Sequence, residues 1–485
     1  MLVVKLNEMQ FEYDIHSLVK AFYPGVEVKV LEKTTEKQSE EGMPEFEIDF
    51  QSTSISFCIV ENSERKYKRE VQLKQPDSRP DVKNDLKQLI YESLSEHLGK
   101  ELPWGTLTGI RPTKIPMTLL EDGKSEEEIL SYMKEVYKIS DEKGSLSLEI
   151  AKREKELLSR LHYKDGYSLY IGIPFCPTTC LYCSFTSYPI CVWKDKVDDY
   201  LAALEKEMEA TAEIMQGKIM DTVYIGGGTP TTLQAEELDR LITKVKETFD
   251  LSNITEFTVE AGRADSITRE KLEVLYKHGI TRISVNPQTM KEDTLKLIGR
   301  QATAAQTVET FNMAREMGFE NINMDIILGL PGETTEDVKD TIEKIKELHP
   351  DSLTVHSLAI KRASKLSQWI ETNGITALNN TDETMEIAAA GAKAMNMQPY
   401  YLYRQKNMSG NFENVGYAEE GKFGIYNILI MEEKQTIVAC GAGTISKRVY
   451  PDGRIERCDN VKDVAGYIER IEEMIERKKE LYKDS

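Results

Sequence analysis

Apolar and polar positions divide the chain into three regions, and the first combines strand and helix patterns. The segment "EFEIDF" alternates apolar and acidic residues and "SISFCIV" is a continuous apolar run, so both are predicted to be strands. Residues 81–98 carry apolar positions at helical spacing, and a stretch punctuated by Pro and Gly follows at 102–116. We therefore predict an α+β domain over residues 1–100 and a helical linker over 101–165.

From residue 166 onwards, short runs rich in β-branched residues alternate with helical segments. The predicted strands are "SLYIGIP", "DTVYIGGG", "EFTVEAG", "RISVNPQ", "INMDIILGLPG" and "SLTVHSL". The predicted helices are 195–216, 235–249, 268–278, 304–317 and 335–348. Apolar strands that alternate with helices are typical of a parallel sheet covered by helices. Six such units are fewer than a closed barrel needs, so an α/β fold with a partial (β/α)6 barrel is predicted over 166–375.

The remaining residues, 376–485, are predicted to form an α+β extension that covers the substrate. Its segment "GKFGIYNILIMEEKQTIVACGAGTISKRVY" is interpreted as a β-hairpin that ends in a Gly-rich turn. The segment "DVAGYIERIEEMIERKKELYKDS" has the pattern of one amphipathic helix. Residues 1–160 are expected to close over the barrel mouth as a lid.

Composition narrows the functional classes. Apolar residues make up 40% and charged residues 30% of the chain, as in ordinary globular proteins. The formal net charge of −20 argues against nucleic-acid partners, because an acidic surface repels phosphate backbones. The N-terminal segment lacks a signal-peptide pattern, and no apolar run is long enough for a membrane helix. We expect a cytoplasmic monomer without a membrane span.

Three of the seven cysteines lie together in "IPFCPTTCLYCSF" as C-x3-C-x2-C, at Cys176, Cys180 and Cys183. They directly follow the first predicted barrel strand, at the end where such folds place their chemistry. A metal or redox site is favoured over disulfides in a large chain without a secretory signal. Structural zinc sites and most iron–sulfur clusters use four protein ligands, so three leave a position open for a small molecule. A three-Cys zinc site with an outside ligand and three unconnected cysteines remain alternatives.

The triplet, with aromatic Tyr182 before its last cysteine, resembles the signature of radical S-adenosylmethionine (SAM) enzymes. The resemblance implies a [4Fe–4S] cluster on Cys176, Cys180 and Cys183, with SAM chelating the open iron. It also implies that one electron from the cluster cleaves SAM to a 5′-deoxyadenosyl radical, which abstracts a hydrogen atom. A flavodoxin or a ferredoxin is the expected electron donor.

Further motifs over about 165–450 resemble the oxygen-independent coproporphyrinogen III oxidase family, and "LTGIRPTK" and "YLYRQKNMSGNFENVGYA" resemble its HemZ-type subgroup. The family motifs are "SLYIGIPFC", "GGGTPT", "VE", "Q", "DIILGLPGET" and "CGAGTIS". The resemblance implies that the SAM on the cluster is contacted by Tyr170, Gly227, Gly228, Glu260 and Ile445. It implies that a second SAM or the substrate is contacted by Tyr182, Thr229, Gln288, Arg300, Asp325 and Ala359. Whether one or two SAM molecules bind stays open.

The chain departs from the family pattern at three places. The better-studied oxidase carries a fourth cysteine where this chain has Phe185, and a histidine in the first strand where it has Gly172. Heme-chaperone members carry a histidine near an Asn–aromatic element, and the comparable segment "NMSGNFENVGYA" contains none. These departures concern the identity of the substrate rather than the SAM chemistry.

The resemblance implies oxidative decarboxylation of coproporphyrinogen III to protoporphyrinogen IX in anaerobic heme biosynthesis. A heme-binding chaperone that retains its cluster is one alternative, and a radical SAM heme methyltransferase or ring-opening enzyme is another. An anionic tetrapyrrole needs fixed cations, preferably arginine. The candidates are Arg111, Arg263, Arg404 and Lys406, with Lys114, Lys361 and Arg362 as further cations and Tyr400, Tyr401 and Tyr403 as aromatic neighbours.

Overall fold

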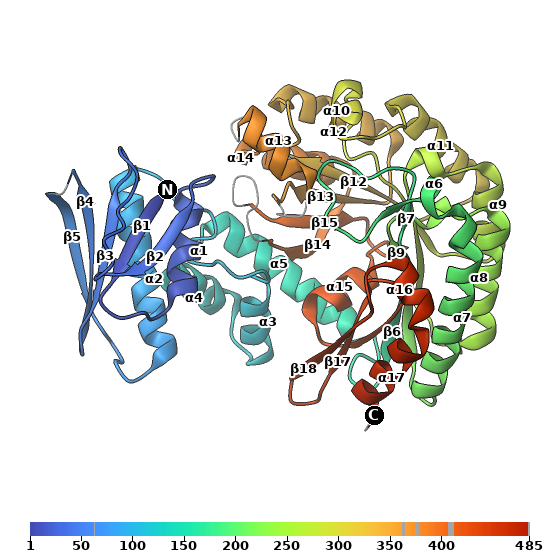
Figure 1. The fold of residues 1–485 in the computed structure, drawn as a ribbon, viewed down its shortest axis with the longest axis horizontal. Helices are drawn as coiled ribbons and strands as arrows, with labels where there is room; N and C mark the ends of the chain where they lie inside the picture. Colours follow the sequence, from blue (N-terminus) through green and yellow to red (C-terminus); the bar gives the residue numbers. More distant parts are fainter. Residues whose placement is uncertain (63, 361–363, 375–377, 406–411, 484–485) are drawn as a thin grey trace. The chain divides into compact units, whose positions relative to one another are not determined.

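The computed structural model describes residues 1–485 except 63, 361–363, 375–377, 406–411 and 484–485 (Figure 1). The chain divides into two compact units. One contains Met1–Lys152 and the described residues of Arg404–Phe412, and the other contains Arg153–Tyr403 and Glu413–Ser485.

The N-terminal unit is built on a five-stranded sheet in the order β2-β1-β3-β4-β5. Its strands are β1 (Leu2–Leu6), β2 (Val28–Glu32), β3 (Glu45–Phe50), β4 (Ser54–Glu61) and β5 (Glu64–Gln72). Its helices are α1 (Glu12–Phe22), α2 (Arg79–Leu98), α3 (Lys114–Glu121), α4 (Glu126–Tyr137) and most of α5 (Asp141–Leu158). β1 pairs in parallel with β2 and β3, whereas β3, β4 and β5 form an antiparallel meander. The prediction of an α+β arrangement is confirmed.

The alternation in "EFEIDF" has a direct structural cause. Phe46 and Ile48 of β3 are completely buried, while the acidic residues between them are only partly buried. The inward side chains join Ile15 of α1 and Leu86 of α2 in one apolar cluster. This cluster is the core of the N-terminal unit.

The second unit is built on an eleven-stranded sheet in the order β14-β15-β13-β12-β11-β10-β9-β6-β16-β17-β18. Its six central strands are β6 (Tyr167–Ile173), β9 (Met220–Gly227), β10 (Glu256–Gly262), β11 (Arg282–Val285), β12 (Ile322–Leu328) and β13 (Ser352–Ser357). All six are parallel. Among the described residues, the two outer strands β14 and β18 do not pair with each other, so the sheet stays open. The predicted partial barrel is confirmed.

Helices follow the parallel strands and lie along the outside of the curved sheet in Figure 1. They include α7 (Val197–Ile214), α8 (Ala235–Thr248), α9 (Arg269–Lys277), α10 (Glu292–Leu297), α11 (Ala304–Met317) and α12 (Thr335–Leu348). Shorter or later helices are α6 (Ile190–Trp193), α13 (Lys365–Asn373) and α14 (Asp382–Ala394). α8 shows why the apolar spacing succeeds as a predictor, because its buried residues Leu238, Leu241, Ile242 and Val245 form a single helical stripe.

The sheet is extended at both edges by strands from the C-terminal part of the chain. β16 (Thr436–Cys440) pairs in parallel with β6, and β17 (Ile445–Val449) and β18 (Ile455–Asp459) continue this edge antiparallel. β15 (Asn414–Ala418) and β14 (Gln398–Tyr403) extend the other edge, also antiparallel. The predicted α+β character of this region is therefore confirmed.

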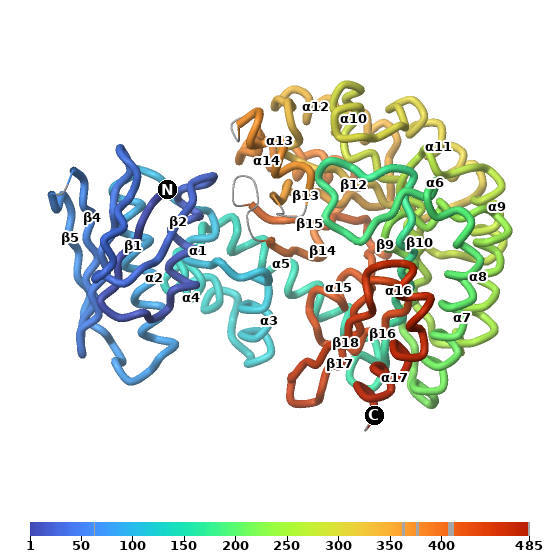
Figure 2. The backbone as a smooth tube through the Cα atoms, viewed as in Figure 1, coloured from blue at the N-terminus to red at the C-terminus, as the bar shows by residue number. Residues whose placement is uncertain are grey.

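Two details of the C-terminal prediction are wrong. The apolar segment before β16 forms helix α15 (Ile425–Glu432) rather than the first strand of a hairpin, and the hairpin consists of β16 and β17. An apolar run of eight residues fits a buried helix as well as a strand, and only its neighbours decide. The C-terminal helix is divided into α16 (Val464–Glu469) and α17 (Ile471–Tyr482), both of which pack against α7 (Figure 2). No helix among the described residues has the length and apolarity needed to span a bilayer.

Candidate functional site

The three clustered cysteines lie in the segment that follows β6. Cys176 ends the short strand β7 (Phe175–Cys176); it is buried, as is Cys180, and Cys183 is partly exposed. The Sγ of Cys176 lies 3.4 Å from the Oγ1 of Thr229, and the Sγ of Cys183 lies 3.7 Å from the Oγ of Ser187. Burial, aided by the two neighbouring thiols, raises the pKa of Cys176 to about 11. A cation bound at this thiol would lower the pKa and remove the proton.

Backbone and hydroxyl hydrogen bonds hold this segment in place. The amide of Cys183 donates to the carbonyl of Cys180 over 3.1 Å, which closes a tight turn between two of the thiols. The amide of Leu181 donates to the carbonyl of Ile298 over 3.0 Å. The hydroxyl of Thr178 donates to the carbonyl of Gly299 over 2.8 Å. The cysteine segment is therefore fixed to the loop that follows α10.

The Gly-rich end of β9 packs directly against the cysteine segment. A Cβ on Gly228 would lie 2.9 Å from the Sγ of Cys176, closer than a side chain can approach. Gly227 has a φ of 111°, and a Cβ there would lie 2.9 Å from the carbonyl oxygen of Ile173. Both positions therefore require glycine, and they leave backbone accessible beside the first thiol.

Glu260 lies near the end of β10, beside the Gly-rich segment, and accepts a hydrogen bond from the hydroxyl of Tyr224. Burial raises the pKa of Glu260 to about 7; the charge of Asp325 adds to the shift, and the hydrogen bond from Tyr224 opposes it. The rings of Tyr224 and Tyr426 stack with centroids 4.4 Å apart, and each lies 6.0 Å from the ring of Tyr170. The predicted residues Tyr170 and Glu260 are thus brought together by Tyr224.

Three buried polar atoms near the ends of β11 and α10 find no hydrogen-bond partner among the described residues. They are the Oε1 of Gln288, the Oδ1 of Asn286 and the Nε of Arg300. Arg300 also donates to the hydroxyl of Tyr182 and to the carbonyl of Asn286, over 3.2 Å in each case. Buried polar atoms are nearly always paired in proteins, so this cluster fits a polar ligand such as SAM.

Gln288 has a further unusual feature, a backbone φ of 68°. Its amide donates to the carbonyl of Asp325, and its carbonyl accepts from the amide of Ile327, each over 2.9 Å. These two bonds hold the residue in the left-handed region, which is unfavourable for a side chain with a Cβ. Strain of this kind is often found where a side chain must face a ligand.

Asp325 lies on β12 and is linked to His356 of β13. Its Oδ1 accepts from the side-chain amide of Asn323 over 2.7 Å, and its Oδ2 lies 3.8 Å from the Nε2 of His356. Burial raises the pKa of Asp325, but the nearby His356 and the hydrogen bond from Asn323 outweigh it and the net shift is downward. The Nδ1 of His356 lies 3.4 Å from the hydroxyl of Tyr403.

The structure places the other predicted SAM residues less centrally. Thr229 contacts Cys176, as described above, whereas Ala359 lies just beyond the end of β13. Ile445 begins β17 and is 48% exposed. Its neighbour Thr444 packs closely on Gly172. A Cβ added to Gly172 would lie 2.5 Å from the Cγ2 of Thr444.

The described members of the predicted set of substrate cations are divided between the two units of the chain. Arg263 is 4% exposed and contacts Asp265 and the cysteine segment, which argues against a role as a free substrate cation. Arg404 belongs to the N-terminal unit, where it donates to the carbonyl of Leu107 over 2.6 Å and lies 5.6 Å from the ring of Trp104.

Arg111 also belongs to the N-terminal unit and is half-buried, and Lys114 begins α3. Lys406, Lys361 and Arg362 lie outside the described residues. Tyr400 and Tyr401 are buried core residues of β14, and only Tyr403 is partly exposed. A substrate-binding role for these tyrosines therefore rests on Tyr403 alone.

Sequence reasoning missed Tyr224, Tyr426 and His356. Tyr224 and His356 lie on predicted strands, and each is a polar residue within an apolar run, which was an available signal. Tyr426 comes from α15, a helix that the apolar pattern did not distinguish from a strand. Nothing in the sequence indicates that this ring joins the site.

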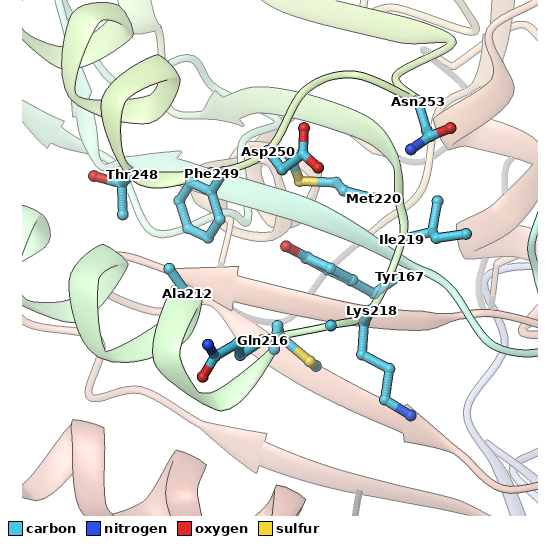
Figure 3. Close-up of a pocket in the computed structure, with 12 residues that line it drawn as sticks. Tyr167, Ala212, Gln216, Lys218, Ile219, Met220, Thr248, Phe249, Asp250 and Asn253 are labelled. Atoms are coloured by element: carbon cyan, nitrogen blue, oxygen red, sulfur yellow. The ribbon is translucent and has the colours of Figure 1, made fainter.

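A cavity of about 320 Å³ lies at the opposite ends of the barrel strands (Figure 3). Its lining includes Tyr167 and Met220, which begin β6 and β9, and Phe249, which follows α8. It contains none of the predicted site residues. The cavity is thus separate from the cysteine segment.

Within the described parts of the chain, no three His, Cys, Asp or Glu side chains are close enough to hold a single metal ion. A four-iron cluster does not need such a group, because each thiolate binds a different iron atom. The donor set fits such a cluster, because three thiols lie on one segment. A glycine packs against the first thiol, and an arginine donates toward the second.

Comparison with known proteins identifies the family. Residues 170–345 match the family model of the radical SAM superfamily. The chain is 44% identical over 402 residues to the oxygen-independent coproporphyrinogen-III oxidase-like protein HemZ of Bacillus subtilis. The aligned residues cover 82% of this chain and 80% of that protein. The chain belongs to the HemZ family of radical SAM proteins. Membership in the superfamily implies a [4Fe–4S] cluster and SAM as cofactors.

Other relatives of this HemZ family member divide between two names. The heme chaperone HemW of Bacillus subtilis is 39% identical over 195 residues, or 40% of this chain and 51% of that protein. The oxygen-independent coproporphyrinogen III oxidase of Escherichia coli is 33% identical over 192 residues, or 40% and 42%. The chain thus spans about half the length of these two relatives. The solved structure of the Escherichia coli oxidase, HemN, matches with a TM-score of 0.51 at 23% identity over 66% of this chain and 72% of that chain, which supports the fold.

Proposed function

We propose that this protein catalyses the radical SAM oxidative decarboxylation of coproporphyrinogen III to protoporphyrinogen IX, in anaerobic heme biosynthesis. The observation that carries the proposal is the polar cluster beside the cysteine segment. Gln288, Asn286 and Arg300 hold buried polar atoms that find no partner within the described chain, and Arg300 also contacts Tyr182 next to Cys183. Such a cluster would suit a polar ligand beside the proposed iron–sulfur cluster.

The similarity to HemZ and to coproporphyrinogen III oxidases supports this choice of reaction. In it, each of two propionate side chains, –CH2–CH2–COO⁻, becomes a vinyl group, –CH=CH2. One hydrogen atom, one CO2 and one electron leave each side chain, so that atoms and charge balance. When bound, the cluster and SAM would supply the group that takes up the hydrogen atom, the electron that leaves each side chain would pass to a separate electron acceptor, and the protein supplies position and electrostatics.

The residues of the strand ends have clear tasks in this proposal. Cys176, Cys180 and Cys183 would hold the cluster, and backbone at Gly227 and Gly228 would face the amino-acid part of SAM. The ionised carboxylate of Glu260 would accept a hydrogen bond from the SAM amino group. Because burial raises the pKa of Glu260 to about 7, this contact would strengthen as the pH rises past neutrality.

A substrate-side role is proposed for the group on β12, β13 and β14. His356 lies between the carboxylate of Asp325 and the hydroxyl of Tyr403, and its side chain is 27% exposed. The contact of Nδ1 with Tyr403 orients the ring, while Nε2 lies 3.8 Å from the Oδ2 of Asp325, which is longer than a hydrogen bond. A propionate of the substrate would accept a hydrogen bond from this Nε2–H, close to Glu260, whose pKa is raised in part by the charge of Asp325.

The experiment is an anaerobic assay of the full chain. The cluster is reconstituted, dithionite, SAM and coproporphyrinogen III are added, and products are followed by mass spectrometry. Loss of two CO2 and appearance of a divinyl product are expected, and the Cys180→Ala variant is expected to produce neither. Cleavage of SAM with unchanged porphyrinogen would reject the substrate while leaving the radical SAM chemistry in place.

A second candidate is a heme chaperone, which the similarity to HemW favours. It predicts that the protein binds heme with a shifted Soret band and leaves coproporphyrinogen III unchanged. Titration with heme, in parallel with the assay above, separates the two candidates. Turnover of coproporphyrinogen III without heme binding would reject the chaperone.

A further inference from the structure

Arg263 is a buried arginine whose guanidinium is used on every side. It follows β10 directly and is 4% exposed. Its Nε and Nη2 donate to the two carboxylate oxygens of Asp265 over 2.9 and 2.6 Å. Its Nη1 donates to the carbonyl and the hydroxyl of Thr178 over 3.0 and 2.9 Å.

The same Nη1 also reaches the Sγ of Cys180, at 3.6 Å. Thr178 lies two residues before Cys180 and is itself bonded to the carbonyl of Gly299. Arg263 therefore fixes the part of the cysteine segment that leads to the second thiol and places a positive charge beside its sulfur.

The pair with Asp265 explains how the guanidinium tolerates burial, but not why it faces a thiol. A buried charge is costly unless it is paired, and one carboxylate already pairs it. The remaining Nη1 could have been satisfied by Thr178 alone. Because Nη1 also approaches Cys180, its positive charge would act on an iron atom bound by that thiol.

We propose that Arg263 is a positioning residue that raises the reduction potential of the cluster through Cys180. The proposal rests on the proposed function, since it requires the cluster to be bound by that thiol. Hydrogen bonds to ligand sulfur and nearby positive charge stabilise the reduced cluster, which carries one more negative charge. A higher potential makes the cluster easier to reduce by the cell's electron donors.

Two substitutions act on this charge in opposite directions. Arg263→Met removes the guanidinium and its bond to Cys180, so the potential is expected to fall. Asp265→Asn removes the compensating negative charge but keeps one acceptor for the guanidinium, so the potential is expected to rise. Arg263→Lys keeps the charge and loses the two-pronged contact, so it should lie between the wild type and Arg263→Met. Arg269→Met removes an exposed arginine at the start of α9 and is the matched control.

The experiment is a redox titration of the reconstituted full-length protein without SAM, monitored by electron paramagnetic resonance, with iron and sulfide measured for each variant. We expect Arg263→Met to change the reduction equilibrium at least tenfold, which is about 59 mV for a one-electron couple. Asp265→Asn should shift it with the opposite sign, and Arg269→Met should leave it unchanged.

Several outcomes would overturn the proposal. An unchanged potential in Arg263→Met with a full cluster would do so, as would an unchanged or lowered potential in Asp265→Asn. If Arg263→Met fails to hold iron, the sign of the Asp265→Asn shift decides alone. A wild-type protein that binds no cluster would reject the proposed function itself, which distinguishes the two failures.

Discussion

The two ends of the parallel strands treat buried polar groups in opposite ways. At the N-terminal ends, Asp221 is completely buried and accepts from the side-chain amide of Gln435 over 2.5 Å and from the amide of His162 over 3.1 Å. Gln435 in turn accepts from Ser168, whose oxygen accepts from Thr222. The polar groups of this network are satisfied by one another.

At the C-terminal ends of the same sheet, polar groups are buried but incompletely paired. Gln288, Asn286 and Arg300 each hold an atom without a partner in the described chain, and Gln288 also adopts a left-handed backbone. The first network stabilises the fold, because each bond replaces one lost to water. The second costs stability until something binds. The comparison teaches that incomplete pairing, more than the number of polar residues, marks the end of this sheet where binding is proposed.

The largest expected effect is the loss of the cluster. Cys180→Ala should abolish the iron–sulfur absorbance and the bound iron after anaerobic reconstitution, because two thiolates cannot hold a cluster in place of three. Cys191→Ala, at an exposed cysteine outside the triplet, is the matched control and should keep both. A full cluster in Cys180→Ala would contradict the ligand assignment.

Next in size is the effect of Glu260 on SAM affinity. A charge-assisted hydrogen bond contributes about 1.5–3 kcal/mol, so Glu260→Gln should weaken SAM binding about 10- to 100-fold at pH 8. Since burial raises the pKa of Glu260 from 4.5 to about 7, the wild-type affinity should rise as the pH increases from 6 to 8. Glu260→Gln should lose this dependence, as calorimetry on the protein with its cluster can show.

The raised pKa of Glu260 also affects the free energy of unfolding, which should fall as the pH rises, whereas SAM affinity should increase. The folded-state pKa of Glu260 lies above the unfolded value, so its contribution to stability is complete below pH 4.5 and is lost as the pH rises through 7.

Asp221→Asn, at the other end of the sheet, is the control for SAM binding. It should lower the free energy of unfolding by about 1–3 kcal/mol and leave SAM affinity unchanged. Weakened SAM binding in Asp221→Asn would break the distinction between the two ends.

An intermediate effect is expected from glycines at the two ends of β6. A Cβ on Gly172 would lie 2.5 Å from the Cγ2 of Thr444, whereas one on Gly166 would lie 2.7 Å from the carbonyl oxygen of His162. Gly172→Ala should cost about 1–3 kcal/mol of unfolding free energy, as overpacking does. Adding Thr444→Ser removes the obstructing methyl group and should restore most of it in chemical denaturation.

Gly166→Ala should be at least as destabilising and should not be restored in the same way, because its obstacle is backbone. Failure of Thr444→Ser to restore Gly172→Ala would show that the close contact with Thr444 is not the reason for glycine at this position.

The smallest expected effect concerns the strained backbone of Gln288. A left-handed residue with a Cβ costs about 1–2 kcal/mol of stability, and glycine removes this strain. Glycine also makes the unfolded chain more flexible, which takes back about 0.4–1 kcal/mol of the gain. Gln288→Gly should therefore raise the free energy of unfolding by about 0.5–1 kcal/mol while it weakens SAM binding. His349→Gly, with a φ of 53° at the end of α12, should stabilise similarly without affecting SAM. A Gln288→Gly protein with unchanged SAM affinity would separate the strain from the binding site.

Local pattern was sufficient for much of the molecule. The apolar spacing of α8 and the alternation of β3 each place their buried residues, because both periods are properties of a short segment. The spacing of Cys176, Cys180 and Cys183 and the glycines at 227 and 228 likewise identify the segment where chemistry is expected. Their assignment as ligands stays a prediction that the cysteine variants test.

Long-range packing decided the rest. Whether residues 425–432 form a helix or a strand depends on their neighbours, and so does the stacking of Tyr426 on Tyr224. Arg263 was predicted from its charge as a substrate cation, yet its guanidinium lies against Asp265 and Cys180. The sequence by itself determined most of the helices and strands and predicted the cysteine segment as a ligand loop, because these follow from local spacing. The tertiary structure alone decided which polar atoms find partners, because their partners come from distant parts of the chain.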